Sequence, residues 1–409
     1  MKRKVWKGIA LTVLSAMLIA VSGLVGCGGE AAGEEIVIGF LCDFTGPGSF
    51  AIKPTVESIQ DYFKVQEEEG TFGDVRITFA TYDTKLDYGR VGPGYESLKA
   101  KGTVMMYVVN PAEAAIIASK AAEDQMPIMT SAVTPEQEPN EWIFNTFSST
   151  GTEVEAVLQY VMDTWDYDTN GVPKIGHLGW TLETTDHHQE GIDSILAEYP
   201  DKFEFVGIQR APVSTSTWAG EVEKLRNSDY ILISAVGSMM ATFIREARDR
   251  DYEGGFLSGI NAFPGYWPTA RDVVPAANLY ECYYAGMWPW YNEDVPFITN
   301  LKSAIETYRA ADAADRLRNS GPITGWMQGW IIADAVKRAI DEYGLENVDS
   351  ATMKEALEAT NLDVQGFGNT WNLDKGPFFV WTKKVFKWST TALDWEAVSG
   401  WITPVSLAD

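Results

Sequence analysis

The sequence is poor in the residues that build metal centres, redox sites and catalytic sets. Its 409 residues include only three cysteines and three histidines. It has no Cys-x-x-Cys pair, no Gly-x-Ser-x-Gly elbow and no glycine-rich loop that would hold phosphate. Ser234 and Ser238 flank Gly237, but no paired histidine is evident. We therefore expect neither an enzyme nor a cofactor.

Positive charge is also scarce. The chain carries 32 Lys and Arg against 57 Asp and Glu, a net charge of -25. A protein this acidic repels nucleic acids and anionic lipid headgroups, so we expect no nucleic-acid partner and no adsorption to a membrane surface through charge.

Long apolar runs are limited to one, at the N-terminus. Lys2, Arg3, Lys4 and Lys7 precede an uncharged apolar stretch from Ile9 to Val25. Small residues and one cysteine follow, which is the order of a secretory signal. Leu24-Val25-Gly26-Cys27 resembles a bacterial lipoprotein box, in which the signal is cut before a cysteine that then carries lipid. The alternative is a simple membrane anchor, although about 17 residues are at the lower limit for a span.

The lipoprotein interpretation divides the N-terminus into a signal peptide over 1–26 and a lipid-anchored tether over 27–35, with Cys27 lipidated. Removal of the signal peptide takes away four of the 32 cationic residues and none of the 57 acidic ones, so the net charge changes from -25 to -29. The remaining thiols, Cys42 and Cys282, are far apart in sequence. We expect two buried free cysteines, and a disulfide between them stays open.

From residue 36 onward, short apolar strands alternate with helical patterns. The predicted strands cover 36–41, 75–82, 104–109, 127–131, 174–180, 203–209, 230–235, 255–258 and 279–286. The predicted helices cover 51–69, 95–100, 112–125, 152–164, 187–198, 218–227, 238–250, 295–311, 323–343 and 350–359. The tail reads as strands over 370–373, 378–382 and 385–388, with Lys383-Lys384 as a hairpin turn. This alternation predicts an α/β fold with two parallel sheets, and ligands bind at the carboxyl ends of such strands.

Several segments resemble one family in the same order. They are Ile36-Val37-Ile38-Gly39-Phe40-Leu41 with Thr45-Gly46-Pro47, then Tyr82-Asp83, Val104 to Pro111, Pro127 to Ala132, and Gly366-Phe367-Gly368. This ordered set is similar to the type I periplasmic binding proteins, specifically the branched-chain amino-acid (Leu/Ile/Val) group that feeds ABC importers. The resemblance implies two Rossmann-like lobes, a three-crossing hinge and a ligand cleft between the lobes.

The resemblance also implies lobe boundaries. The first lobe would comprise 36–146 plus 288–364, and the second 147–287 plus 365–409. The three crossings would lie near 144–148, 285–290 and 361–366.

Ligand contacts can be transferred from the family only in part. In the first lobe the matching positions are Asn110, Ala112, Thr130 and Ser131, where hydroxyls and helix N-terminal amides would hold a carboxylate. Pro111 has no amide proton, so the neighbouring amides of Ala112 and Glu113 would have to donate. The loops after the first two strands add Asp43, Phe44 and Tyr82 to the predicted ligand-binding set.

The second lobe departs from the family pattern. Relatives often carry Tyr-Gly after the first strand of this lobe, whereas this chain has Trp180 to His188. Asn261 stands near the glycine-rich turn where amino-acid binders place a Glu for the ligand ammonium. Asp186 is a candidate replacement charge.

Aromatic residues are frequent near the predicted cleft. Trp180, Tyr266 and Tyr284 are candidates for an apolar wall around the organic body of a ligand. Trp267, Trp288 and Trp290 lie on predicted loops or a crossing. Ordinary core or hinge packing is the alternative for each of these six rings.

Asp186-His187-His188 invites comparison with a metal site. Adjacent helical histidines point about 100° apart and rarely share an ion. We predict a solvated helix start with Asp186 as the N-cap, and no metal.

Taken together, the sequence predicts an exported, lipid-anchored solute-binding protein on the outer face of the cell membrane or in the periplasm. It would capture a small organic acid or amino acid, with aromatic and branched ligands among the candidates, and deliver it to an ABC permease. The alternative is a sensor that presents its ligand to a membrane receptor; neighbouring permease and ATPase genes would favour import.

Overall fold

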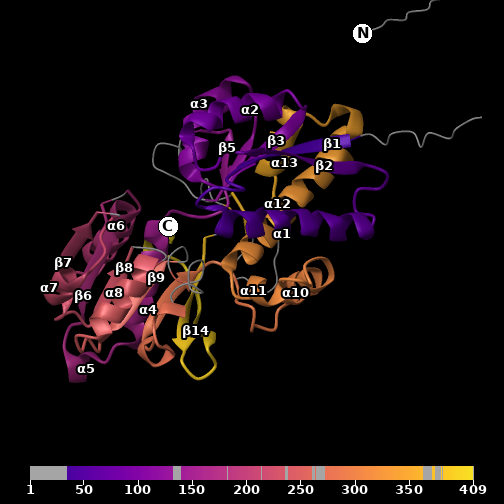
Figure 1. Ribbon diagram of the computed structural model, residues 1–409. Coiled ribbons are helices and arrows are strands. Elements are labelled where there is room, and N and C mark those ends of the chain that lie inside the picture. Colours follow the sequence, from indigo (N-terminus) through magenta and orange to yellow (C-terminus); the bar gives the residue numbers. More distant parts are fainter. Residues whose placement is uncertain are drawn as a thin grey trace, which may run out of the picture. The chain divides into compact units, whose positions relative to one another are not determined.

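A computed structural model describes residues 35–131, 140–181, 183–212, 214–234, 238–259, 263, 272–362, 371–373, 379 and 381–408. Within this part of the chain two large sheets and their covering helices form two α/β lobes (Figure 1). The predicted signal, tether and Cys27 lie outside the described residues, as do Asn261, Tyr266 and Trp267.

The first lobe is built on a five-stranded sheet in which every pairing is parallel. In spatial order its strands are β2 (Arg76–Asp83), β1 (Glu35–Cys42), β3 (Thr103–Val108), β4 (Ile128–Thr130) and β5 (Ile143–Asn145). The alternation of side chains along β1 sends Ile38 and Phe40 to one face and Leu41 to the other, and both sets are buried.

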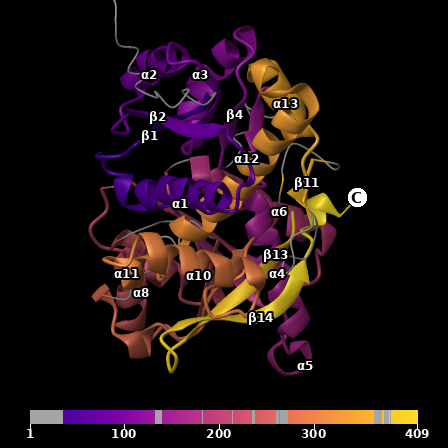
Figure 2. The same ribbon diagram turned by 90° about the vertical axis from the view of Figure 1, so that its right-hand side faces the viewer.

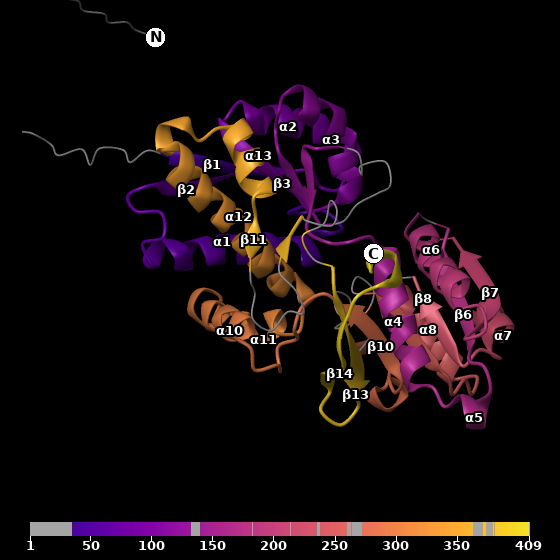
Figure 3. The same cartoon turned by 180° about the vertical axis from the view of Figure 1, so that it is seen from behind.

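Helices cover both faces of this first sheet (Figures 1 and 3). Leu41 packs with α2 (Val91–Lys99) and α3 (Pro111–Glu123), while Phe40 belongs to the core shared with α1 (Ser49–Glu68) and α12 (Ser320–Tyr343). Another helix, α13 (Ser350–Glu358), also contacts β3. Segments almost 300 residues apart therefore complete one lobe.

A glycine stripe brings α1 and α12 into close contact, as Figure 2 shows for their ribbons. Gly321, Gly325 and Gly329 recur at every fourth residue of α12 and face α1. A Cβ atom on Gly325 would lie 2.0 Å from the Thr55 carbonyl oxygen. The Ser58 hydroxyl donates to the Pro322 carbonyl at 2.7 Å across the same interface. Only glycine permits this approach of the two backbones.

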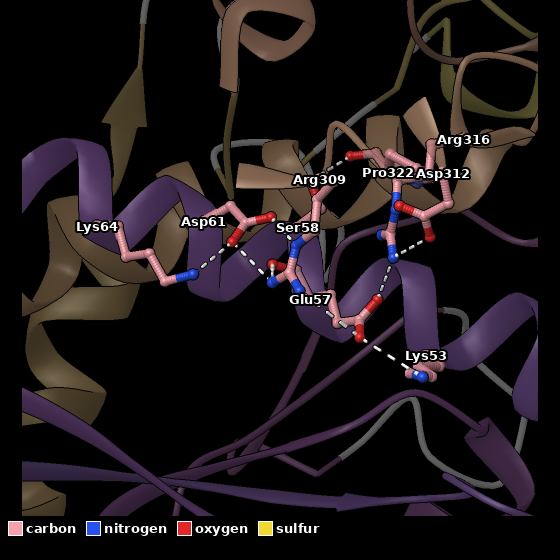
Figure 4. Close-up of polar contacts among 9 residues, drawn as sticks. All are labelled: Lys53, Glu57, Ser58, Asp61, Lys64, Arg309, Asp312, Arg316 and Pro322. Atoms are coloured by element: carbon pink, nitrogen blue, oxygen red, sulfur yellow. Dashed lines mark hydrogen bonds and ion pairs between the residues drawn. The ribbon is translucent and has the colours of Figure 1, made fainter. Parts of the chain in front are cut away.

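Ion pairs attach α10 (Pro296–Tyr308) and α11 (Ala313–Arg316) to α1 (Figure 4). Arg309 donates to both carboxylate oxygens of Asp61, through Nε at 2.6 Å and Nη2 at 2.7 Å. Arg316 pairs with Glu57 at 2.6 Å and with Asp312 at 2.8 Å. Because Asp61 is almost fully buried, loss of these partners would leave a poorly paired charge in the interior.

The second lobe is built on a seven-stranded sheet. In spatial order its strands are β14 (Asp394–Ile402), β13 (Lys383–Ser389), β10 (Cys282–Gly286), β9 (Gly255–Gly259), β8 (Tyr230–Ile233), β6 (Lys174–Trp180) and β7 (Glu204–Ala211). The five strands from β10 to β7 are parallel, and the yellow hairpin of β13 and β14 joins them antiparallel (Figure 3).

Both faces of the second sheet are covered as well. One face carries α4 (Thr150–Thr164) and α6 (Glu183–Glu198), which pack on Ile175, Leu232 and Leu257. The other carries α7 (Ala219–Leu225) and α8 (Ser238–Arg248). Smaller elements include a single turn, α5 (Tyr167–Asn170), and a two-stranded ladder of β11 (Asn361–Leu362) and β12 (Trp371–Asn372).

The predicted α/β alternation is confirmed, with local corrections. Trp381 and Thr382, from the predicted strand over 378–382, belong to no strand. The stretch 144–148, predicted as a crossing, begins inside β5, the fifth strand of the first sheet. Lys383-Lys384 is not a turn but the start of β13; the hairpin turn follows Ser389, and β14 was not predicted. The second helix begins at Val91 and not at Tyr95. Inside it, Gly94 makes room for the Tyr82 ring, which lies 2.6 Å from where a Cβ would be.

The two remaining cysteines are free and buried, as expected. Cys42 lies on β1 of the first sheet and Cys282 on β10 of the second. Burial raises the pKa of the Cys282 thiol to about 12 and raises that of Cys42 further. Both behave as small core residues.

Candidate functional site

Two loops at the carboxyl edge of the first sheet are joined through aspartates. Asp83, at the end of β2, accepts from the Phe44 amide at 2.9 Å and from the Thr45 hydroxyl at 2.5 Å. Partial burial alone would raise the pKa of Asp83, but these hydrogen bonds outweigh it and lower the pKa. Asp43 is fully buried, and its carboxylate accepts from the amides of Gly46 and Gly48. Asp43 therefore shapes its own loop instead of offering a free charge.

The amides expected to hold a carboxylate at the start of α3 are used inside the helix cap. The Asn110 side chain accepts from the Ala112 amide at 3.0 Å, and the Asn110 carbonyl accepts from the Glu113 amide at 3.1 Å. The two amides expected to donate to a ligand therefore both have acceptors within the cap. Tyr82 is half-buried against α2, with the Arg90 guanidinium 5.6 Å from its ring centroid.

A buried carboxyl group stands at the same edge. Glu113 has no exposed surface, and neither of its carboxylate oxygens has a hydrogen-bond partner among the described residues. Burial raises its pKa; the neighbouring Thr84 hydroxyl opposes that rise and Asp43 adds to it. The sequence indicates the Glu113 amide as a candidate donor, but no sequence pattern marks the Glu113 side chain. The start of α3 is thus a poor anion site.

The hydroxyls at the end of β4 are better placed. Ser131 is half-buried, and its oxygen accepts from Gln328 Nε2 at 3.3 Å. The same amide nitrogen donates to Thr146 at 2.7 Å, while Gln328 Oε1 accepts from the Tyr107 hydroxyl. Thr130 is fully buried, and its carbonyl accepts from the amide and hydroxyl of Thr146. Gln328 comes from α12, almost 200 residues further along the chain, so no local sequence pattern indicates that it orients Ser131.

The two described residues of the predicted aromatic wall, Trp180 and Tyr284, differ in burial. Trp180 ends β6, is half-buried and leaves its indole nitrogen without a partner among the described residues. Tyr284 is fully buried, stacked on Phe386 at 5.0 Å and edge-on to Trp395 at 4.8 Å. Tyr284 therefore packs in the core of the second lobe, which is the alternative that the sequence left open for this ring.

Two further tryptophans on the second predicted crossing also pack internally. Trp290 donates its indole N–H to Asp394 at 2.7 Å. Trp288 lies against Phe147 of the first crossing, with ring centroids 5.4 Å apart. These contacts place both rings in core and hinge packing.

A buried lysine links the start of β13 to the first predicted crossing. Lys383 Nζ donates to the Ser148 hydroxyl at 2.6 Å and to the Trp381 carbonyl at 3.0 Å. Burial lowers the pKa of Lys383 to about 8, against the opposing effect of Glu153 and Glu155. Glu153 itself sits at the carboxyl edge of the second sheet, where a Cβ on Gly259 would lie 2.1 Å from Glu153 Oε2.

The predicted solvated helix start with Asp186 as its N-cap is wrong. The helix begins at Glu183, and Asp186 lies inside it, paired with Arg210 at 2.6 Å. His188 is 3% exposed, and its Nδ1 lies 2.6 Å from the Ser234 hydroxyl. That hydroxyl is also 2.6 Å from His177 Nε2, so Ser234 has two histidine partners where the sequence showed none.

This pairing resembles a nucleophile and its base, but the geometry argues against catalysis. Ser234 is 3% exposed, and its hydroxyl is already hydrogen-bonded to two imidazoles, so it is not open to a substrate. In the described part of the chain, no group of three or more His, Cys, Asp or Glu could hold a metal ion. The same part contains no helix that is both long and apolar enough to cross a bilayer.

Comparison with known structures supports the fold over most of the chain. A branched-chain amino acid ABC transporter protein from Thermus thermophilus, solved with bound valine, has a TM-score of 0.76 at 14% identity, covering 91% of this chain and 97% of that one. A fatty acid ABC transporter substrate-binding protein from Thermomonospora curvata has a TM-score of 0.74 at 18% identity, covering 90% and 92%.

A branched-chain amino acid transporter substrate-binding protein from Streptococcus pneumoniae, in complex with isoleucine, has a TM-score of 0.71 at 14% identity, covering 90% and 100%. Sequence comparison with curated proteins found no match. The profile described as "Periplasmic binding protein" matches residues 35–379. The homologues are substrate-binding proteins and not enzymes. With two parallel-sheet lobes and a profile match over most of its length, this chain belongs to the periplasmic binding protein family.

Proposed function

We propose that this protein is the extracytoplasmic solute-binding lipoprotein of an ABC import system. The observation that carries the proposal is the pair of parallel-sheet lobes, each with polar side chains at its carboxyl edge. Ligands of open α/β sheets bind at such edges. The lobes comprise 36–146 plus 288–364 and 147–287 plus 365–409.

The proposed ligand is a small organic acid or amino acid. Ser131, oriented by Gln328, takes the carboxylate, because the amides at the start of α3 already have acceptors. Trp180 contacts the organic body, since its ring is only half-buried and its indole N–H lacks a described partner. Two similar structures hold valine and isoleucine, and a third belongs to a fatty acid transporter, so their ligands cover the same range.

Retention at the membrane would come from lipid on Cys27, since the other two cysteines are buried in the core. Binding needs no covalent step. Ligand contacts to both lobes would favour the closed arrangement, which an ABC permease then recognises.

The experiment is a thermal-shift screen of the mature protein against amino acids, aliphatic acids and aromatic acids, followed by calorimetry on the compounds that stabilise it. At a ligand concentration 100 times Kd, about 2.7 kcal/mol of stabilisation is expected. If no small acid or amino acid stabilises the protein, the proposed function is wrong.

A further inference from the structure

The second lobe carries a chain of polar side chains that the ligand contacts above do not use. Ser234, the first residue after β8, has its hydroxyl 2.6 Å from His177 Nε2 and 2.6 Å from His188 Nδ1. His177 Nδ1 lies 2.8 Å from Gln189 Oε1, and Gln189 Nε2 donates to Asp193 at 2.8 Å. We call these five residues the Ser234 relay; it runs from exposed Asp193 to buried His188.

The direction of every hydrogen bond in the relay follows from its exposed end. A carboxylate only accepts, so Gln189 presents its NH2 to Asp193 and its carbonyl to His177. His177 must then carry its proton on Nδ1, which leaves Nε2 as an acceptor for the Ser234 hydroxyl. Having donated its one proton to His177, Ser234 accepts from His188 Nδ1.

The relay thus leaves Nε2 of His188 unprotonated. With its proton on Nδ1, His188 Nε2 is an acceptor, and it is buried without a partner among the described residues. Burial lowers the pKa of His177 to about 4 and that of His188 to about 3, so neither ring is an imidazolium at neutral pH. A buried acceptor left unpaired is unfavourable, and a donor at this point would relieve that cost.

His188 belongs to a group of buried polar atoms at the carboxyl edge of the second sheet. Ser234 follows β8 directly and α6 follows β6, so the relay lies at the carboxyl edge of the second sheet. Two more buried polar atoms without described partners belong to the same β6–α6 segment, the Trp180 indole nitrogen and the Thr185 hydroxyl. Polar atoms gathered at this edge are where a ligand of this fold would find its partners.

We propose that the Ser234 relay fixes His188 Nε2 as the acceptor for a hydrogen-bond donor of the ligand. The inference rests on the proposed function and narrows it. The ligand carries an N–H or O–H beside its carboxylate, as amino acids and hydroxy acids do, and a plain fatty acid does not. His188 would then accept the hydrogen bond that a Glu accepts in amino-acid binders, at the turn where this chain has Asn261.

The first experiment reads the relay without any ligand. The chain has only three histidines, so 15N-histidine labelling of the mature protein gives a spectrum that His187→Gln and His188→Gln variants assign. We expect His177 and His188 to show the Nδ1–H tautomer, with no titration between pH 5 and 8. A proton on Nε2 of His188 would overturn the proposal.

The second experiment compares matched ligands by calorimetry. L-leucine is compared with 4-methylpentanoate, and L-phenylalanine with 3-phenylpropanoate; each pair differs only by the α-ammonium. Wild type should bind the better amino acid at least tenfold tighter than its counterpart. Saturation with that amino acid should shift the His188 Nε2 resonance.

Variants separate recognition from folding. His188→Leu should abolish the preference and His188→Gln, which keeps an acceptor, should retain part of it, while His187→Gln should leave it unchanged. Melting curves identify any variant that fails to fold, and the tautomer spectrum of wild type then still decides. Equal weakening of both members of a pair by His188→Leu would overturn the relay proposal. Tight binding of 4-methylpentanoate or 3-phenylpropanoate by wild type would overturn it while leaving the solute-binding function intact; binding of no acid at all would reject both.

Discussion

At the scale of single residues, burial decides which side chains at the sheet edges remain available. Asp43 and Asn110 hold their own loops, and Tyr284 is enclosed by aromatic rings. Ser131 and His188 differ because each is oriented by an internal partner and retains capacity for another bond. A hydrogen bond from an internal partner holds such a binding group in one orientation.

The buried histidines predict a specific acid sensitivity. Because the folded-state pKa values of His177 and His188, about 4 and 3, lie below the ordinary 6.5, the unfolded chain binds more protons between these values. Their contribution is complete above pH 6.5 and is lost as the pH falls toward 4. A pH unit of unequal protonation is worth about 1.4 kcal/mol, so each histidine should cost about 2 kcal/mol between pH 6.5 and pH 5.

Urea denaturation at pH 7, 6 and 5 measures this loss. His188→Asn keeps a donor toward Ser234 but cannot titrate, so its stability should fall less steeply with pH than that of wild type. His187→Asn, the matched control, should follow the wild-type slope. Parallel slopes for all three proteins would contradict the assignment.

Ser131 and Gln328 should separate binding from stability. Ser131→Ala removes one half-buried hydroxyl and should weaken binding of the best acid about tenfold, with unfolding free energy changed by less than about 1 kcal/mol. Gln328→Leu leaves Tyr107, Ser131 and Thr146 without a shared partner and should cost about 2–4 kcal/mol in stability as well. Calorimetry and urea denaturation of both variants test this, and equal destabilisation by the two would contradict it.

At the scale of elements, the first lobe depends on how closely α12 approaches α1. Gly325→Ala would force a methyl group against the Thr55 carbonyl, where 2.0 Å is available. Overpacking of this kind costs about 1–3 kcal/mol, and contact with backbone favours the upper end. Gly220→Ala in the first turn of α7, where a Cβ meets nothing within 4 Å, should be neutral or stabilising by up to about 1 kcal/mol. Chemical denaturation gives both values; a neutral Gly325→Ala would mean that the helices can separate without cost.

The ion pairs between α10 and α1 should outweigh those on exposed helix faces. Arg309→Met removes the bidentate partner of the nearly buried Asp61, whose remaining ion-pair partner among the described residues is the exposed Lys64 at 2.9 Å. The expected loss is about 1–3 kcal/mol, because an acid left poorly paired in the interior is unfavourable. Lys337→Met breaks an exposed i,i+4 pair with Asp341 and should change stability by less than about 0.5 kcal/mol. Thermal and urea unfolding compare the two, and similar losses would show that burial of Asp61 is unimportant.

At the scale of the whole molecule, periodicity was sufficient to predict the α/β alternation and most strands, because strands buried on both faces read as short apolar runs. It could not reveal contacts between distant segments. Gln328 lies almost 200 residues after Ser131, and Ser234 lies about 50 after its histidines. Nor could it show whether a polar group near a strand end is used internally, as at Asn110 and Asp43. The β5 and β14 strands were missed because one is short and the other mixes polar with apolar residues.

The position of the binding protein at the membrane should depend on one thiol. Cys27 precedes β1 by eight residues, so Cys27→Ser should move the protein from the membrane fraction to the soluble fraction without changing its melting temperature or ligand affinity. The Cys282→Ala protein should stay in the membrane fraction. Its free energy of unfolding should fall by about 1–2 kcal/mol, because the Cys282 side chain is fully buried. Detergent phase partitioning, lipid labelling and melting curves on the three proteins measure these effects. Retention of Cys27→Ser in the membrane would instead favour the uncleaved apolar run as a simple anchor, since a single lipid-bearing cysteine and a spanning segment of about 17 residues predict opposite outcomes for this one substitution.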